Sequence, residues 1–174
     1  MEITIRRVTE IDVAKLSSLA KQTFFDTFSE TCSKEDMQSF LGQYFSEEAL
    51  LWELQTENDF CFFAEAEGKP VGYLRFMEDY SSFPLMKKWK ALELKRIYIL
   101  KEYHGKGVAQ KLMDFTLAFG RDKGYEVIWL GVWQHNLRAQ LFYKKYGFED
   151  SGHTHDFPIG NTPQTDIWMW KFIQ

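Results

Sequence analysis

A glycine loop between a predicted strand and a predicted helix has the residue types of an anion site. The strand ends with Ile97, Tyr98 and Ile99, and residues 104–109, His-Gly-Lys-Gly-Val-Ala, lead into a helix predicted over 107–121. A helix N-terminus offers unpaired backbone N–H groups and the positive end of the helix dipole. Glycine lets phosphate oxygens approach the backbone closely, and Lys106 can add a charge contact. This pattern predicts a pyrophosphate site.

Two other phosphate loops do not fit these residues. A Walker loop needs GxxxxGK[ST], which is absent, and a dinucleotide fingerprint needs a third glycine where this chain has Gln110. A glycine turn that precedes a surface helix, without any ligand, remains the alternative.

A second segment lies one predicted strand further along the chain. Residues 136–148 read Asn-Leu-Arg-Ala-Gln-Leu-Phe-Tyr-Lys-Lys-Tyr-Gly-Phe. Together, the two segments resemble the GNAT superfamily of N-acetyltransferases. The acyl-CoA loop of that superfamily, Gln/Arg-x-x-Gly-x-Gly/Ala, corresponds here to His104-x-x-Gly107-x-Ala109, with His104 departing from the usual Gln or Arg. The resemblance implies an α/β GNAT fold: a mixed central β-sheet flanked by helices, with an acyl-CoA site at the splayed central strands.

The resemblance also implies roles for individual residues. The backbone of the strand that ends at Ile99 would bind the pantetheine arm as an added strand, and one of its N–H groups would stabilise the thioester oxyanion. Asn136 and the helix that follows it would contact the rest of acetyl-CoA, which is the co-substrate. The implied coenzyme contacts are Ile97, Tyr98, Ile99, His104, Gly105, Lys106, Gly107, Val108, Ala109, Gln110, Asn136, Phe142 and Tyr143.

Two residues are candidates for proton transfer. Tyr143 matches the general acid of the family, which protonates the departing CoA thiolate; a phenol suits this, with an ordinary pKa of about 10 against about 8.5 for a thiol. Its alternative is a core aromatic residue of an amphipathic helix. Glu93 lies where some family members place a catalytic Glu, and its alternative is an exposed strand carboxylate. Proton removal from the amine can also go through water and backbone carbonyls.

The remaining elements agree with one α/β domain over residues 1–174. The predicted strands lie near 4–8, 60–64, 71–76, 91–100, 127–130, 149–155 and 166–172. The predicted helices follow Thr9, occupy two parts of 34–56, and cover 107–121 and 136–146.

Charge is segregated along the chain. The net charge is −4, but residues 26–59 hold nine acidic residues against one lysine, a local charge of −8, while the rest carries +4. The overall balance argues against a nucleic-acid binder that works by charge alone. An acidic segment near a cleft would attract a polycationic amine. A solvated helical face is the alternative.

Three further segments resemble the PaiA-type spermine/spermidine acetyltransferases: 93–98, 155–161 and 164–169. The resemblance implies direct transfer from acetyl-CoA to a small cationic amine, above all a polyamine, in a ternary complex. A protein N-terminus, a lysine or an antibiotic amine remain alternative acceptors. The alternative that is not an enzyme is a regulatory module that binds acyl-CoA without turnover.

Other features of the sequence bear on cellular location, metal binding and oligomeric state. Two cysteines without CxxC spacing, no signal pattern and no long apolar run predict a cytoplasmic protein without a membrane segment. His153 and His155 share a strand face, but no third ligand is apparent, so no metal is predicted. Members of the GNAT superfamily are often dimers, which leaves a homodimer open.

Overall fold

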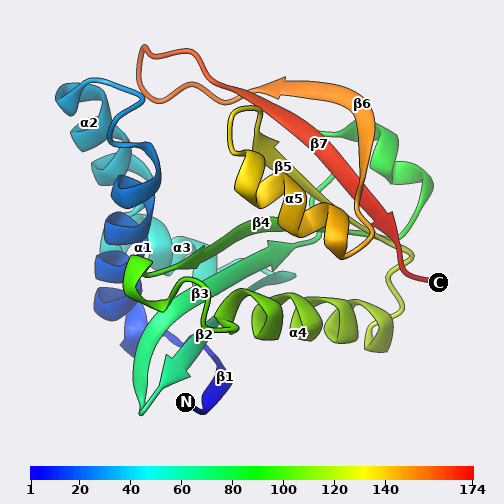
Figure 1. Ribbon diagram of the computed structural model, residues 1–174, viewed down its shortest axis with the longest axis horizontal. Helices are drawn as coiled ribbons and strands as arrows, with labels where there is room; N and C mark the ends of the chain where they lie inside the picture. The colour runs from blue at the N-terminus through cyan, green and yellow to red at the C-terminus, as the bar shows by residue number, and fades with distance from the viewer.

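The computed structural model describes all residues, 1–174, and is built on one seven-stranded sheet (Figure 1). The strand order is β1-β2-β3-β4-β5-β7-β6, and β4 with β5 is the only parallel pair. The strands are β1 Ile3–Arg7, β2 Asp59–Ala66, β3 Lys69–Met77, β4 Ala91–Ile99, β5 Val127–Trp133, β6 Glu149–Asp156 and β7 Thr165–Phe172. The mixed sheet predicted from the sequence is confirmed.

Five α-helices and three short 3-10 turns connect the strands. The helices are α1 Val13–Phe28, α2 Lys34–Tyr44, α3 Glu47–Gln55, α4 Val108–Asp122 and α5 Leu137–Lys145. The 3-10 turns are η1 Glu10–Asp12, η2 Pro84–Lys88 and η3 Lys101–Tyr103. No helix is long and apolar enough to cross a membrane.

Local sequence signals explain where these helices begin. The hydroxyl groups of Ser33 and Ser46 accept hydrogen bonds from Asp36 N and Ala49 N, which caps α2 and α3. The carboxylate of Asp12 accepts a bond from the backbone N–H of Thr9 at 3.0 Å, as expected for a capping box. The box caps the N-terminus of η1, and α1 begins at Val13, directly after Asp12.

Apolar clusters cover both faces of the sheet. One cluster joins strands β2 to β5 with α4 and α5, through residues such as Leu112 and Tyr143. The other joins the opposite face of β2 and β3 with α1, α2 and α3, through residues such as Phe24 and Phe63. Figure 1 shows these groups of helices on separate sides, with α1 to α3 in blue and cyan and α4 and α5 in green and yellow. The helices therefore hold the sheet from both faces.

Candidate functional site

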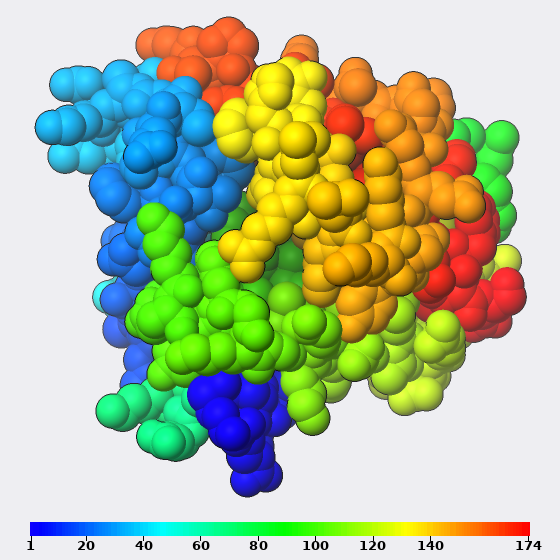
Figure 2. Space-filling model, viewed as in Figure 1, coloured from blue at the N-terminus to red at the C-terminus, as the bar shows by residue number.

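The two central strands separate part-way along their length. Strands β4 and β5 are paired only from Ala91 to Glu93 and from Val127 to Trp129, although they continue to Ile99 and Trp133. Beyond the pairing lies a cleft of about 610 Å³, whose wall comes from α1, β4, η3, the start of α4, β5, α5 and β7. Figure 2 shows the surface hollowed between the green segment before α4 and the yellow start of α5.

The edge of β4 that faces this cleft pairs with no strand beyond Glu93, and the side chain of His104 contacts it at Ile99 O. The other edge of β4 pairs with β3, with Ile97, Tyr98 and Ile99 opposite Leu74, Tyr73 and Gly72. A register shift between Arg75 and Phe76 marks a β-bulge before this stretch. An unpaired strand edge binds extended molecules that carry amide groups. The three predicted strand residues therefore line the cleft with an edge suited to an amide-containing arm.

The loop before α4 has the backbone geometry that the sequence predicted. Gly105 and Gly107 have φ angles of +74° and +82°, in the left-handed region that favours glycine. The first backbone hydrogen bond of α4 runs from Lys111 N to Gly107 O at 3.1 Å. The N–H groups of the first three helical residues are therefore free of intrahelical partners. These residues, Val108, Ala109 and Gln110, line the cleft.

Lys106 does not line the cleft beside these amides. Its Nζ lies 5.0 Å from the centre of the Tyr103 ring, a cation–π contact. Gly107 also lies outside the cleft wall, where it sets the turn into α4. The sequence predicts a coenzyme contact for both residues.

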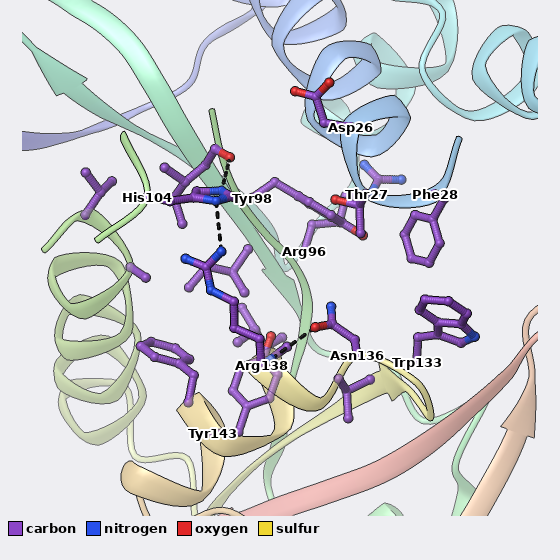
Figure 3. A pocket seen from close by; sticks show the side chains of 18 of the residues that line it. Asp26, Thr27, Phe28, Arg96, Tyr98, His104, Trp133, Asn136, Arg138 and Tyr143 are labelled. Atoms are coloured by element: carbon purple, nitrogen blue, oxygen red, sulfur yellow. Dashed lines mark hydrogen bonds between the residues drawn. The ribbon is translucent and has the colours of Figure 1, made fainter. Parts of the chain in front are cut away.

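His104 bridges the two sides of the cleft mouth. Its Nε2 lies 2.9 Å from Ile99 O, and its Nδ1 lies 3.1 Å from Nη1 of Arg138 (Figure 3). A guanidinium group can only donate, so Nδ1 accepts and Nε2 donates its hydrogen to the carbonyl oxygen. The departure from Gln or Arg at this position thus puts an imidazole between the β4 end and α5.

Helix α5 brings three predicted residues to the opposite wall. Asn136 caps the helix, because its Oδ1 accepts a bond from Ala139 N at 3.1 Å, which leaves its NH₂ group as a donor. Phe142 and Tyr143 both line the cleft, and Tyr143 is buried. Burial raises the pKa of Tyr143, so its phenol stays protonated at neutral pH.

Glu93 lies on the closed side of the strand separation. It is buried, 4% exposed, and it is absent from the cleft wall. Its Oε2 is 3.0 Å from Nζ of Lys95 in an ion pair, and burial raises its pKa to about 7. The alternative of an exposed strand carboxylate is therefore wrong, and a catalytic Glu93 would have to act without lining the cleft.

The far end of the cleft is aromatic and acidic. Phe28 lies between Trp133 and Phe157, with ring centres 5.7 and 6.3 Å away. These three rings line the cleft together with Asp26 and Asp166 (Asp26, Phe28 and Trp133 are labelled in Figure 3). Neither Asp166 nor Phe157 is predicted for this site from the sequence. Asp166 reaches this site because β7 pairs with β5, and Phe157 reaches it from the loop after β6. No local sequence motif predicts this arrangement.

The comparison with protein families decides what kind of domain holds this cleft. Residues 18–148 match the model of the "Acetyltransferase (GNAT) family". The chain belongs to the GNAT family of acetyltransferases. This confirms the family resemblance and the enzyme class, an acyltransferase.

Known GNAT proteins cover the chain over nearly its full length. An uncharacterized N-acetyltransferase in the pepI 3' region of Lactobacillus delbrueckii subsp. lactis is 33% identical over 171 residues, 98% of each chain. The crystal structure of PaiA N-acetyltransferase from Thermoplasma acidophilum in complex with coenzyme A aligns with a TM-score of 0.80. It covers 99% of each chain at 23% identity, so it shows the fold. A thialysine N-epsilon-acetyltransferase of Bos taurus is 34% identical over 115 residues, 60% of this chain and 65% of its own.

The acidic segment of this GNAT domain meets the cleft at one residue. Of its nine acids, only Asp26 lines the cleft, and Lys101 Nζ lies 3.9 Å from its Oδ1. Three others bind within the protein: Glu53 and Asp59 pair with buried arginines, and Asp36 holds residues 161–162. Asp26 is therefore the one acid of this segment that can meet an acceptor in the cleft.

Cysteine and histidine side chains elsewhere in the GNAT domain are held in packing contacts. Cys61 is buried, and burial raises its pKa to about 12, which agrees with an inert core thiol. Cys32 is half-buried. His155 stacks on Trp168 with ring centres 4.7 Å apart, while the His153 ring is 5.4 Å from that of Phe83.

Proposed function

We propose that this GNAT protein transfers the acetyl group of acetyl-CoA to a primary amine of a small cationic acceptor, with a polyamine such as spermidine or spermine as the first candidate. The observation that carries the proposal is the cleft between β4 and β5. Its wall carries free backbone amides and basic side chains, and it also carries carboxylates and aromatic rings. An anionic coenzyme fits the first set of groups and a cationic acceptor fits the second.

Acetyl-CoA would lie along the free edge of β4. The pantetheine amides would pair with Ile97 to Ile99, and the pyrophosphate would lie at the amides of Val108 to Gln110, at the positive end of α4. Arg138 lies next to these amides through His104 and adds a positive charge at the same mouth. Phe142 supplies an apolar wall, and the free NH₂ of Asn136 a donor.

Tyr143 would protonate the sulfur of the departing coenzyme. Its phenol remains protonated because burial disfavours the charged form. The thiolate that forms in the same cleft is also removed from water. Burial therefore disfavours its charge and raises its affinity for a proton. No cysteine or serine lines the cleft, which supports direct attack by the amine in a ternary complex without a covalent enzyme intermediate.

A polyamine suits the acceptor end for two reasons. Asp26 and Asp166 supply two negative charges on different walls, and a polyamine carries several positive charges along an apolar chain. Phe28, Trp133 and Phe157 can contact that chain and stabilise its ammonium groups through cation–π attraction. The free cysteines and the need for acetyl-CoA support the predicted cytoplasmic setting.

A lysine-like side-chain amine is the second candidate acceptor. It is favoured by the likeness to the bovine thialysine N-epsilon-acetyltransferase over 60% of this chain. Thialysine carries a carboxylate beside its α-amino group, whereas spermidine carries only positive charges. The two candidates therefore differ in their charge interactions with Asp26 and Asp166, the carboxylates that line the cleft.

An acceptor panel tests the proposal. The purified protein is incubated with acetyl-CoA and spermidine, spermine, thialysine, lysine or butylamine, and CoA release and acetylated product are measured at low and high salt. We expect kcat/KM for spermidine to exceed that for butylamine by at least tenfold and to fall as salt screens the carboxylates. Equal values without salt dependence would exclude a polyamine preference. CoA binding without turnover on any amine would favour the regulatory module.

A further inference from the structure

Asp166 on β7 presents an unpaired carboxylate to the cleft. In the sheet it lies opposite Trp133 of β5, at the open end of the strand separation, and opposite His155 of β6. It lines the cleft, yet its Oδ1 is buried and has no hydrogen-bond partner. Asp166 as a whole is half-buried, but a buried carboxylate oxygen without a partner is costly to a fold, so a ligand that satisfies it would be bound favourably.

The cations that β4 contributes to the cleft wall are engaged elsewhere. Both terminal nitrogens of Arg96 donate to Glu53, at 2.7 and 2.9 Å. Nζ of Lys95 lies 3.0 Å from Glu93 and 3.5 Å from Asp79. His155, the cross-strand neighbour, stacks its ring on Trp168. Hence no cationic side chain of this wall neutralises Asp166.

Two phenols are the other titratable groups that face this carboxylate. Burial raises the pKa of Tyr98 and of Tyr143, and the Asp166 charge raises both further. All three residues line the cleft, Tyr98 from β4, Tyr143 from α5 and Asp166 from β7. Asp166 therefore shares the cleft with Tyr143, the proposed acid for the leaving sulfur.

Gly131 on β5 provides the space for this carboxylate. A Cβ atom at residue 131 would lie 3.0 Å from Oδ2 of Asp166 and 2.7 Å from the Trp168 ring. Any side chain there would push Asp166 or Trp168 aside. The absence of a side chain at 131 thus lets Asp166 occupy the open end of the split.

We propose that Asp166 binds the ammonium group of the acceptor and removes its proton before attack. This assignment rests on the proposed acetyl transfer and deepens it, because it names the residue that selects a cationic amine. It also places the proton acceptor on β7, inside the cleft, rather than at Glu93 on the closed side of the split.

The ammonium R–NH₃⁺ gives one proton to the Asp166 carboxylate, and the nitrogen lone pair forms the C–N bond to the thioester carbon. The C–S bond breaks with its electron pair on sulfur, which takes the phenol proton of Tyr143. The new amide nitrogen then loses its second proton, which restores the phenol through water. Asp166 returns its proton to solvent, so one proton is released per turnover.

Burial suits Asp166 to this task, since it raises the pKa of this carboxyl to about 6. A base with that value is ionised at neutral pH and is stronger than an ordinary aspartate. The acid limb of kcat/KM is therefore expected near pH 6. In a variant without the carboxylate, kcat/KM should instead rise with pH as the free amine itself becomes available.

Asp166→Asn tests the assignment, with Asp156→Asn as a matched control on the neighbouring strand, exposed and outside the cleft wall. For the best acceptor of the panel, we expect kcat/KM to fall at least 100-fold in D166N, within the range of general-base catalysis, with loss of the limb near pH 6. CoA affinity should stay within threefold, and D156N should match the wild type. A D166N enzyme with wild-type kcat/KM and pH profile would overturn the assignment while acetyl transfer stands.

Calorimetry of amine binding to the CoA complex separates the two proposals. Spermidine should bind the wild type at least tenfold more tightly than D166N, even where no turnover occurs. If no amine is acetylated but this difference persists, acetyl transfer fails and the ammonium site at Asp166 stands. Equal spermidine affinity in both proteins would overturn the ammonium site.

Discussion

Glu93 and Trp129 form the last paired position of the parallel strands β4 and β5. One residue further on, Leu94 already lines the cleft. This pair therefore marks the boundary between closed sheet and open site. Two carboxyl groups with raised pKa values fall on different sides of it: Glu93 with the closed strands, and Asp166 in the wall of the cleft.

Glu93→Gln is expected to stabilise the protein at high pH. The folded-state pKa of Glu93, about 7, lies above its ordinary value. The protonated carboxyl group therefore contributes to the free energy of unfolding at low pH, and this contribution is lost as pH rises through 7. The glutamine variant avoids that loss. Its free energy of unfolding in urea should exceed that of the wild type by up to about 3 kcal/mol at pH 8 and match it near pH 4.

The same variant separates the two candidate bases. Because Glu93 does not line the cleft, we expect E93Q to keep kcat/KM within tenfold of the wild type. A loss of 100-fold or more in E93Q, with CoA affinity unchanged, would return the role of base to Glu93.

Tyr143→Phe is expected to lower kcat about 100-fold, because the sulfur loses its proton donor. The affinity for CoA, measured by calorimetry, should not change, since the phenyl ring still fills the buried position. Tyr44→Phe on the exposed end of α2 is the control and should behave as the wild type. Unchanged kcat in Y143F would show that water protonates the leaving group.

Gly107→Ala is expected to weaken acetyl-CoA binding. A residue with a Cβ pays about 1–2 kcal/mol in the left-handed conformation that Gly107 adopts, so the loop would shift and move the α4 amides. The Kd for CoA should rise at least tenfold. Gly42→Ala within α2, where a Cβ meets open space, should leave the Kd unchanged and raise stability by about 0.5–1 kcal/mol. Equal Kd values in both variants would contradict the proposed pyrophosphate site.

Glu53→Gln is expected to destabilise the fold rather than to change acceptor choice. Glu53 accepts from Arg96 and lies 3.0 Å from Arg75, and all three side chains are largely buried. Removing one partner of a buried ion pair costs about 3–5 kcal/mol. Urea denaturation should show this loss, whereas Glu47→Gln, at the exposed start of α3, should cost less than about 0.5 kcal/mol. A stable E53Q with altered kcat/KM would instead assign Glu53 to substrate binding.

Local sequence patterns were enough to predict the elements and the coenzyme side of the cleft. Alternating or continuous apolar runs mark the strands other than β6, whose residues Glu149–Asp156 include no large apolar side chain, and Gly107 marks a helix start that the structure confirms. The loop at 104–110 and the residues at 136–143 are each contiguous, so a single strand–loop–helix motif reports them.

The acceptor side depends on contacts between distant residues. Asp166 reaches the cleft because β7 inserts between β5 and β6, an order that no local pattern specifies. Glu53 and Asp36 are paired with residues 43 and about 125 positions away along the chain. Charge counted along the chain could not distinguish these paired acids from Asp26, which lines the cleft.

A crystal structure with CoA and spermidine tests the central claim most directly. The account predicts the pantetheine along Ile97 to Ile99, the pyrophosphate at the amides of Val108 to Gln110, and the sulfur within hydrogen-bond reach of the Tyr143 hydroxyl. It also predicts a spermidine nitrogen within about 3 Å of an Asp166 carboxylate oxygen, the usual length of a charged hydrogen bond. CoA bound outside the β4–β5 cleft, or spermidine bound away from Asp166, would contradict it.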